Sequence, residues 1–229
     1  METSRTIVIS LGGSMIFSDG IDVAFVRSFC ELVRDYVQKG YRFAIITGGG
    51  KVCRTYQHAL AELRPTTNTD LDWMGIYVTR VNAQFVRMAL EDIAHPEIIL
   101  DPTELVTTTA PVIIGAGWKP GWSTDFDAVT FASTIGAQSV INISNVAYVY
   151  TADPKTNPDA VKLTDVTWAE FRKIIPDTWQ SGANMPFDPI ASKYADEHNI
   201  SVVFMAGNNL QNLENYLNAQ PFEGTLIHT

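Results

Sequence analysis

The 229-residue sequence has few of the features by which a chain binds nucleic acid or enters a membrane. It has no run of lysine and arginine, and its formal net charge is −9, which argues against nucleic acid as a partner. No apolar stretch approaches the roughly 20 residues of a membrane-spanning helix. The apolar run from Ile7 to Leu11 is too short for a signal peptide. We therefore expect a soluble, cytoplasmic protein with no nucleic-acid or membrane partner.

Cysteine is also scarce. The only two, Cys30 and Cys53, form no C-x-x-C pair, so the sequence gives no support to a zinc or redox site, and we expect no metal site built by the protein. Both cysteines fall in predicted helices. We expect them to be small buried hydrophobic side chains in a reducing compartment.

The common glycine motifs for phosphate are missing as well. Gly49-Gly50-Lys51 is followed by Val52, which lacks the hydroxyl that holds Mg²⁺ in G-x-x-x-x-G-K-[ST]. The glycines between residues 115 and 121 do not have the spacing of G-x-G-x-x-G. A mononucleotide or dinucleotide site of either type is therefore not predicted.

What the chain has instead is three glycine clusters without these motifs, at residues 12–13, 48–50 and 115–121, each after a predicted strand. Glycine lets backbone N–H groups approach a phosphate, and the N-terminus of a following helix adds partial positive charge. Arg54 lies one helical turn beyond the second cluster and could close such a site as a bidentate clamp. Any one cluster is also compatible with an ordinary tight turn. Three at strand ends indicate more phosphate than one mononucleotide carries.

Strand-like and helix-like segments alternate along the chain. We predict strands at 6–11, 42–47, 98–100, 112–114, 139–143 and 201–205, and helices at 23–38, 50–63, 72–90, 125–135, 168–175 and 189–198. Residues 64–69 are predicted to be a loop. The alternation is typical of an α/β fold with a mainly parallel sheet, whose ligands bind beyond the carboxyl ends of the strands. No linker or repeat divides the chain, so we expect one domain over 1–229, with halves of about 1–137 and 138–229 that handle different ligands.

Several motifs occur in an order that resembles a known family. They are Leu11-Gly12-Gly13-Ser14, Ile46-Thr47-Gly48-Gly49-Gly50-Lys51, Asp72-Trp73-Met74-Gly75-Ile76, Thr79-Arg80-Val81-Asn82-Ala83, Pro120-Gly121-Trp122-Ser123-Thr124-Asp125, Tyr150-Thr151-Ala152-Asp153-Pro154 and Asp188-Pro189-Ile190-Ala191-Ser192-Lys193. Over nearly the whole chain they resemble the amino-acid kinase superfamily and, within it, the archaeal-type UMP kinases. The segments 79–83 and 150–154 are the most specific.

The resemblance implies a three-layer αβα sandwich around a mainly parallel sheet. It also implies a kinase of pyrimidine nucleotide biosynthesis that transfers the γ-phosphate of ATP to UMP, giving UDP. Mg²⁺ would be carried by ATP. The implied assembly is a homo-oligomer, namely a hexamer built as a trimer of dimers.

Residue roles follow from the same resemblance. The implied ATP-binding residues are Ser10, Leu11, Gly12, Gly13, Ser14, Gly50, Arg54, Ser144, Asn145, Tyr150 and Asp153. The implied UMP-binding residues are Gly49, Asp72, Trp118, Lys119, Pro120, Gly121, Trp122, Ser123 and Thr124. The implied catalytic residues are Arg54, Asp125 and Lys193.

Five of these residues also have a plain structural interpretation. Arg54 and Lys193 could be solvated helix residues, and Tyr150 could belong to the core. Asp72 could do no more than favour a helix N-terminus, and Asp125 could simply cap a helix. The sequence leaves both interpretations open for each.

The first departure from the family pattern is Ser10, which stands where much of the superfamily has a lysine. The archaeal UMP kinases also tend to lack that lysine, so the departure supports the subfamily. It leaves Lys51, Lys119 and Lys193 as candidates for the cation at the γ-phosphate.

Two further departures concern loops. Ala147-Tyr148 replaces an Asp-Gly pair beside the predicted adenine site, and the loop of residues 115–125 is one residue longer than usual. That loop carries Trp118 and Trp122, for which contact with a ligand or subunit is favoured over packing. Two alternatives to a UMP kinase therefore stay open: a sibling kinase of the same fold with another acceptor, and a non-catalytic nucleotide-binding or storage protein.

Overall fold

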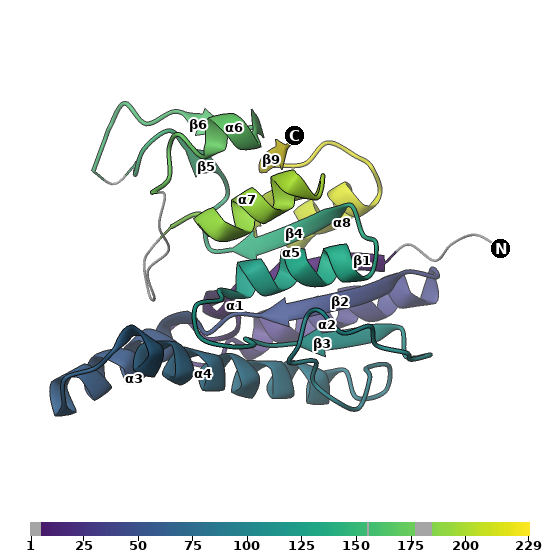
Figure 1. Ribbon diagram of the computed structural model, residues 1–229. Coiled ribbons are helices and arrows are strands. Elements are labelled where there is room, and N and C mark those ends of the chain that lie inside the picture. Colours follow the sequence, from purple (N-terminus) through teal and green to yellow (C-terminus); the bar gives the residue numbers. More distant parts are fainter. Residues whose placement is uncertain (1–5, 155, 177–184) are drawn as a thin grey trace.

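The computed structural model describes residues 6–154, 156–176 and 185–229. Its centre is a seven-stranded sheet with the strand order β3-β2-β1-β4-β8-β9-β7 (Figure 1). Neighbouring strands run parallel, except that β8 and β9 are antiparallel. The sheet strands are β1 (Thr6–Leu11), β2 (Arg42–Thr47), β3 (Val112–Gly115), β4 (Ser139–Ser144), β7 (Asp165–Thr167), β8 (Ser201–Ala206) and β9 (Thr225–His228). A separate antiparallel pair is formed by β5 (Val149–Tyr150) and β6 (Lys162–Leu163).

Helices cover both faces of the sheet. One face packs against α2 (Val23–Gln38), α4 (Asn68–Ala89) and α8 (Leu210–Leu217), and the other against α5 (Thr124–Thr134), α6 (Trp168–Phe171) and α7 (Pro189–Glu197). The short α1 (Gly13–Ile16) follows β1, and α3 (Gly50–Leu63) packs on α4 outside the two layers (Figure 1). This arrangement confirms the predicted α/β sandwich with a mainly parallel sheet.

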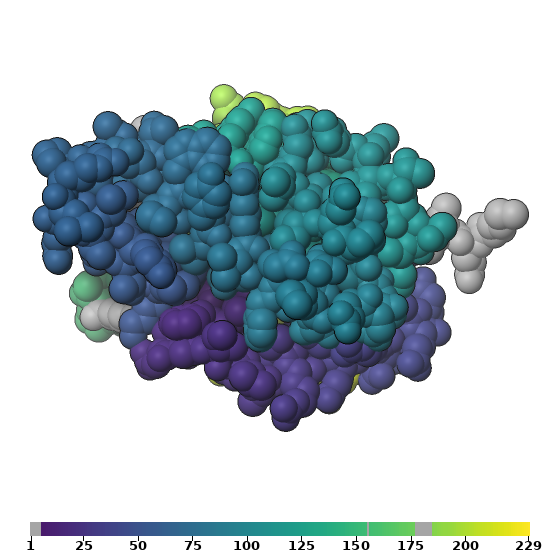
Figure 2. Space-filling view, turned by 90° about the horizontal axis from the view of Figure 1, so that it is seen from below, coloured from purple at the N-terminus to yellow at the C-terminus, as the bar shows by residue number. Residues whose placement is uncertain are grey.

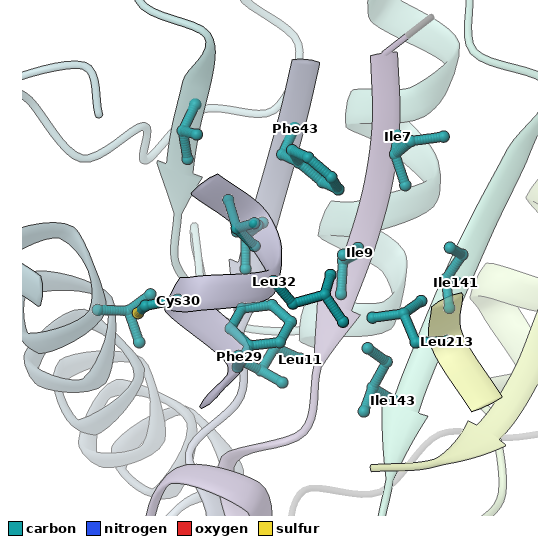
Figure 3. Packing of buried hydrophobic residues seen from close by; sticks show 14 of the residues in the cluster. Ile7, Ile9, Leu11, Phe29, Cys30, Leu32, Phe43, Ile141, Ile143 and Leu213 are labelled. Carbon is teal, nitrogen blue, oxygen red and sulfur yellow. The ribbon is translucent and has the colours of Figure 1, made fainter. Parts of the chain in front are cut away.

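The alternation of side chains along the central strands explains the two layers. Ile7, Ile9 and Leu11 of β1 point into the core on the α2 side, where Phe29 of α2 and Leu213 of α8 meet them (Figure 3). Val8 of the same strand belongs to the core on the α5 side. A strand that is buried on both faces must be apolar at nearly every position, and β1 meets that requirement at all positions but Thr6 and Ser10.

The largest correction concerns the start of α4. Residues 64–69 are only partly a loop, because α4 begins at Asn68 instead of the predicted 72. Thr67 and Asp70 form a reciprocal capping box, and the Arg64 guanidinium pairs with the Asp70 carboxylate at 2.9 Å. This pairing, together with the bonds from Thr67, holds the pKa of Asp70 well below its usual range. The polar stretch therefore starts a helix instead of separating two elements.

Other boundaries also differ from the prediction. The predicted strand at 98–100 is only a single bridge between Ile99 and Gly115, and the predicted helix at 168–175 ends at Phe171. The sequence analysis did not predict α1, α8, β5, β6, β7 or β9, which are two to eight residues long. Elements this short depend on their tertiary partners and carry little periodicity of their own.

Candidate active site

The loops after β1, β2, β3, β4 and β8 lie at one edge of the sheet, because these five strands run parallel. β1 is the strand from which the sheet grows in both directions, with β2 on one side and β4 on the other. The crevice beyond such a strand is where open α/β sheets bind ligands. The structure therefore brings the three predicted glycine clusters to the same edge.

Two of these clusters touch through their backbones. The Gly48 N–H donates to the Leu11 carbonyl at 2.8 Å. A Cβ atom on Gly13 would lie 2.2 Å from the Gly50 nitrogen, and one on Gly50 would lie 2.4 Å from the Gly13 carbonyl carbon. Gly50 also has a φ of +68°. The crossing thus requires glycine at both positions.

The N-terminus of α3 faces this crossing without a side-chain cap. Its N-cap residue, Gly49, makes no capping bond, whereas α4 and α5 are capped by Thr67 and Ser123. The first N–H groups of a helix have no partner inside it, so those of α3 are available to an anion. The Asn82 amide fixes the loop by donating to the Gly48 carbonyl at 2.8 Å. Such a fixed, uncapped end is suited to phosphate.

Asp125 connects the two strands at the centre of the sheet. Its Oδ1 accepts a bond from the Ser10 hydroxyl at 3.0 Å and one from the Asn142 amide at 2.8 Å. Ser10 and Asn142 are register partners on β1 and β4. Burial, followed by the nearby Asp188 carboxylate, raises the pKa of Asp125 to about 7. The capping interpretation of Asp125 is wrong, because the Ser123 hydroxyl caps α5 by accepting the Phe126 N–H.

Two further carboxyls lie close to Asp125 and were not assigned a role from the sequence. Asp188 caps α7 by accepting the N–H groups of Ile190 and Ala191, and burial raises its pKa. Asp127, on α5, is also buried. None of the three carboxyls forms an ion pair within the described ranges. The Asp188-Pro189 pair was a usable indication of the cap, since proline favours the first helical position.

The loop after β3 is gripped by α4. The Thr79 hydroxyl accepts the Gly117 N–H at 2.9 Å, and Arg80 Nη2 donates to the Trp118 carbonyl at 3.0 Å. Both residues belong to the Thr-Arg-x-Asn-Ala segment, which the sequence analysis singled out without a structural role. Their role in the structure is to hold this loop.

Asp72 contributes to the same grip. Its Oδ2 accepts the Gly121 N–H at 2.8 Å, and Gly121 has a φ of +83°, a conformation that favours glycine. Its Oδ1 is buried and has no hydrogen-bond partner in the part of the chain that the structure describes. The interpretation of Asp72 as a helix-end charge is wrong, since Asp70 holds that place in the first turn. One free oxygen remains for a ligand.

The tryptophans of this loop pack against each other and against α5. The Trp122 ring stacks on Phe126 with centroids 4.0 Å apart, and Trp118 meets Trp122 edge-on at 4.6 Å. The Lys119 ammonium lies 3.5 Å from the Trp118 ring centroid. Packing, which the sequence analysis ranked second, is therefore part of their role. Pro120 belongs to the same loop, and Thr124 is the first residue of α5.

The predicted nucleotide residues lie on the other half of the edge. Ser144 ends β4, and its hydroxyl accepts the Val146 N–H at 3.1 Å. Asn145 is exposed, and Asp153 lies in the exposed turn that follows β5. Tyr150 is half-buried on β5, so it is not a full core residue, and part of its side chain is accessible. Leu11 and Ser14 flank the first glycine pair at the end of β1 and in α1.

The candidate cations differ in their surroundings. Arg54 is exposed on α3, and Lys193 is exposed on α7. Lys51 forms an ion pair with Asp19, and Lys119 rests on tryptophan rings. Arg54 and Lys193 form no ion pair with any described residue, whereas Lys51 would have to leave Asp19 to meet an anion.

The comparisons with known proteins agree with this geometry. The model of the Amino acid kinase family matches residues 5–206. The chain belongs to this family. It is 34% identical to the uridylate kinase of Thermoplasma volcanium over 98% of both chains, and 33% identical to that of Pyrococcus abyssi over 81% of this chain and 83% of that protein. The structure of uridylate kinase from Archaeoglobus fulgidus matches with a TM-score of 0.82 and 29% identity, covering 97% of this chain and 99% of that one.

In this amino acid kinase, the fold and the family resemblance expected from the sequence are thus confirmed. The described part of the chain contains no helix that is both long and apolar enough to cross a membrane.

Proposed function

We propose that this amino acid kinase transfers the γ-phosphate of ATP to UMP, giving UDP. The observation that carries the proposal is the backbone crossing of Gly13 with Gly50, next to the uncapped N-terminus of α3. It joins two glycine loops into one anion-binding surface between the two halves of the sheet edge. The relatives named uridylate kinase span nearly the whole chain, which favours UMP as the acceptor over another small molecule.

We assign the ATP phosphates to the backbone of residues 10–14 and 50. The Gly12 N–H bonds the Ile143 carbonyl at 2.8 Å, so this loop lies directly beside the end of β4. The adjacent residues Ser144, Asn145, Tyr150 and Asp153 would hold the nucleoside. The C-terminal half, about 138–229, would thus be the nucleotide side.

We assign UMP to the other half, about 1–137. Gly49 and Asp72 would contact UMP, the latter through its Oδ1, which has no hydrogen-bond partner among the described residues. The remaining contacts would come from the loop segment Trp118–Thr124, whose hydroxyls, peptide groups and aromatic rings suit a nucleotide. Ser123 would contribute chiefly as the cap that fixes α5.

The chemistry asks for alignment and positive charge more than for a base, because the UMP phosphate is already ionised. Backbone N–H groups of the crossed loops and the Arg54 guanidinium would stabilise the transferring group, each preorganised donor being worth roughly 3 kcal/mol of barrier. Asp125 would keep the strand ends in register through Ser10 and Asn142. Lys193 would add charge from α7. Mg²⁺ would arrive with ATP as part of the substrate.

We also propose a homo-oligomer, in which α4 is one contact face and the full assembly is a hexamer built as a trimer of dimers. The helix α4, in blue, lies on the face of the molecule that Figure 2 shows. Its exposed side chains include Trp73, Tyr77, Val81 and Met88 at helical spacing. Val81 alone is 69% exposed. A row of large apolar side chains on one solvent face of a 22-residue helix is typical of a protein contact.

The function is tested by an ATP-consumption assay with Mg²⁺ and a panel of UMP, CMP, dUMP, AMP and isopentenyl phosphate. We expect turnover on UMP with UDP as the product. Arg54→Ala should lower kcat at least tenfold, while Arg27→Ala, at an exposed arginine of α2 outside the glycine loops, serves as the matched control. Turnover on another acceptor alone would favour a sibling kinase. Nucleotide binding without any turnover would favour a non-catalytic protein.

A further inference from the structure

The loop after β3 is held from both helical layers of the sandwich. On the α4 side it has three side-chain partners, namely Asp72, Thr79 and Arg80. On the α5 side, among the described residues, its one side-chain hydrogen bond is to Asp127, whose Oδ2 accepts the Trp118 N–H at 3.3 Å. The Trp122 ring also stacks on Phe126 of α5. Trp118 is thus clamped through its N–H by one layer and through its carbonyl by the other.

The surroundings of Asp127 are unusual for a carboxyl. The residue is 1% exposed, and its Oδ1 has no hydrogen-bond partner among the described residues. Burial raises its pKa well above the usual range, and the nearby carboxylates of Asp125, Asp188 and Asp101 raise it further. No cation compensates it within those residues. This environment therefore favours the uncharged form of the carboxyl.

A buried polar group with an unpartnered oxygen lowers stability, and an apolar side chain of the same shape would remove that cost. Thr130, one turn further along α5, also has a buried unpartnered hydroxyl, but it makes no bond to the loop. Asp127 accepts a hydrogen bond from the Trp118 N–H, and Thr130 does not. The feature that distinguishes Asp127 is therefore its connection to the loop that carries Trp118, Lys119 and Trp122.

We propose that Asp127 is a positioning residue for the acceptor: by holding the Trp118 peptide from the α5 side, it fixes the loop of residues 115–122 in its binding conformation. This inference rests on the proposed function, in which that loop binds UMP. Without Asp127, the Trp118 N–H loses its side-chain partner, and the Trp118 peptide keeps only the bond from Arg80 to its carbonyl. UMP binding then weakens, whereas the ATP residues on the other half of the edge are unaffected.

The experiment compares Asp127→Leu, which has nearly the same shape and no acceptor, with Asp127→Asn, which keeps an acceptor oxygen for the Trp118 N–H. Thr130→Val is the matched control on the same helix. Two quantities are measured for each: the KM values for UMP and ATP, and hydrogen–deuterium exchange of the peptide that contains Trp118. Thermal unfolding confirms that each variant is folded, and Asp127→Ala replaces Asp127→Leu if the latter is not.

We expect Asp127→Leu to raise the KM for UMP about tenfold and to speed exchange at the loop by a similar factor, with the KM for ATP within twofold. Asp127→Asn and Thr130→Val should stay near the parent protein in both measurements. Unchanged exchange and KM in Asp127→Leu would overturn the proposal, as would an equal effect of Thr130→Val. If the parent protein does not phosphorylate UMP, the proposed function fails, and the exchange measurement alone still decides whether Asp127 holds the loop.

Discussion

The crossing of the two glycine loops makes a sharp prediction for Gly50→Ala. The new Cβ would lie 2.4 Å from the Gly13 carbonyl carbon and 2.5 Å from its oxygen, both backbone atoms that cannot rotate away. A φ of +68° adds about 1–2 kcal/mol for a residue with a Cβ, and overpacking adds about 1–3 kcal/mol. The sum is about 2–5 kcal/mol, which in a chain of this size lowers Tm by roughly 4–20 °C.

Gly20→Ala is the matched control, because its Cβ would meet no atom within 4 Å and its φ is not in the left-handed region. Thermal unfolding should show the loss for Gly50→Ala and little change for Gly20→Ala. The displaced loop should also lower kcat in the phosphotransfer assay, since it moves N–H groups out of line. A Gly50→Ala protein with the parent Tm and kcat would refute the claim that this crossing is close and builds the site.

Two other predictions follow from the carboxyl cluster and the α4 face. The raised pKa of Asp125, about 7, means that the folded state binds its proton more tightly than the unfolded state, so the free energy of unfolding falls as pH rises from about 4 to 7. The loss is at most roughly 4 kcal/mol. Denaturant unfolding of Asp125→Asn should show a free energy of unfolding that depends less on pH than that of the parent protein. The same pH dependence in both proteins would contradict the raised pKa of Asp125. Val81→Asp on α4 should shift the mass measured by light scattering to a smaller species, whereas Leu105→Asp, also on an exposed apolar residue but in a loop, should not; equal masses for both would exclude α4 as a contact face.

The sequence predicts an element well when the element's own residues show a hydrophobic pattern, and poorly when contacts with distant segments form it. β1, β2 and α2 were predicted with the observed bounds, because a doubly buried strand is continuously apolar and α2 has a clear apolar stripe. The start of α4 was missed because its capping box uses Asp70 instead of the usual Glu or Gln. β9 was missed because its four residues are held in place by β8 and β7, which lie far away in sequence.

The candidate site shows the same division between backbone and side chains. Glycine clusters at strand ends locate backbone N–H groups, and the sequence placed them at the right edge of the sheet. The sequence could not show which polar side chains form hydrogen bonds within the protein instead of binding a ligand. Ser123, predicted to bind UMP, caps α5 in the structure. Asp125, predicted to be catalytic with capping as the alternative, connects β1 to β4. Both are short polar residues two positions apart. The packing of α5 against the sheet decides that Ser123 bonds a backbone N–H of the helix and that Asp125 bonds side chains of the strands. Site residues near a helix start therefore have to be assigned from the tertiary structure, and it is at such positions that Asp127 gained a role that no motif indicated.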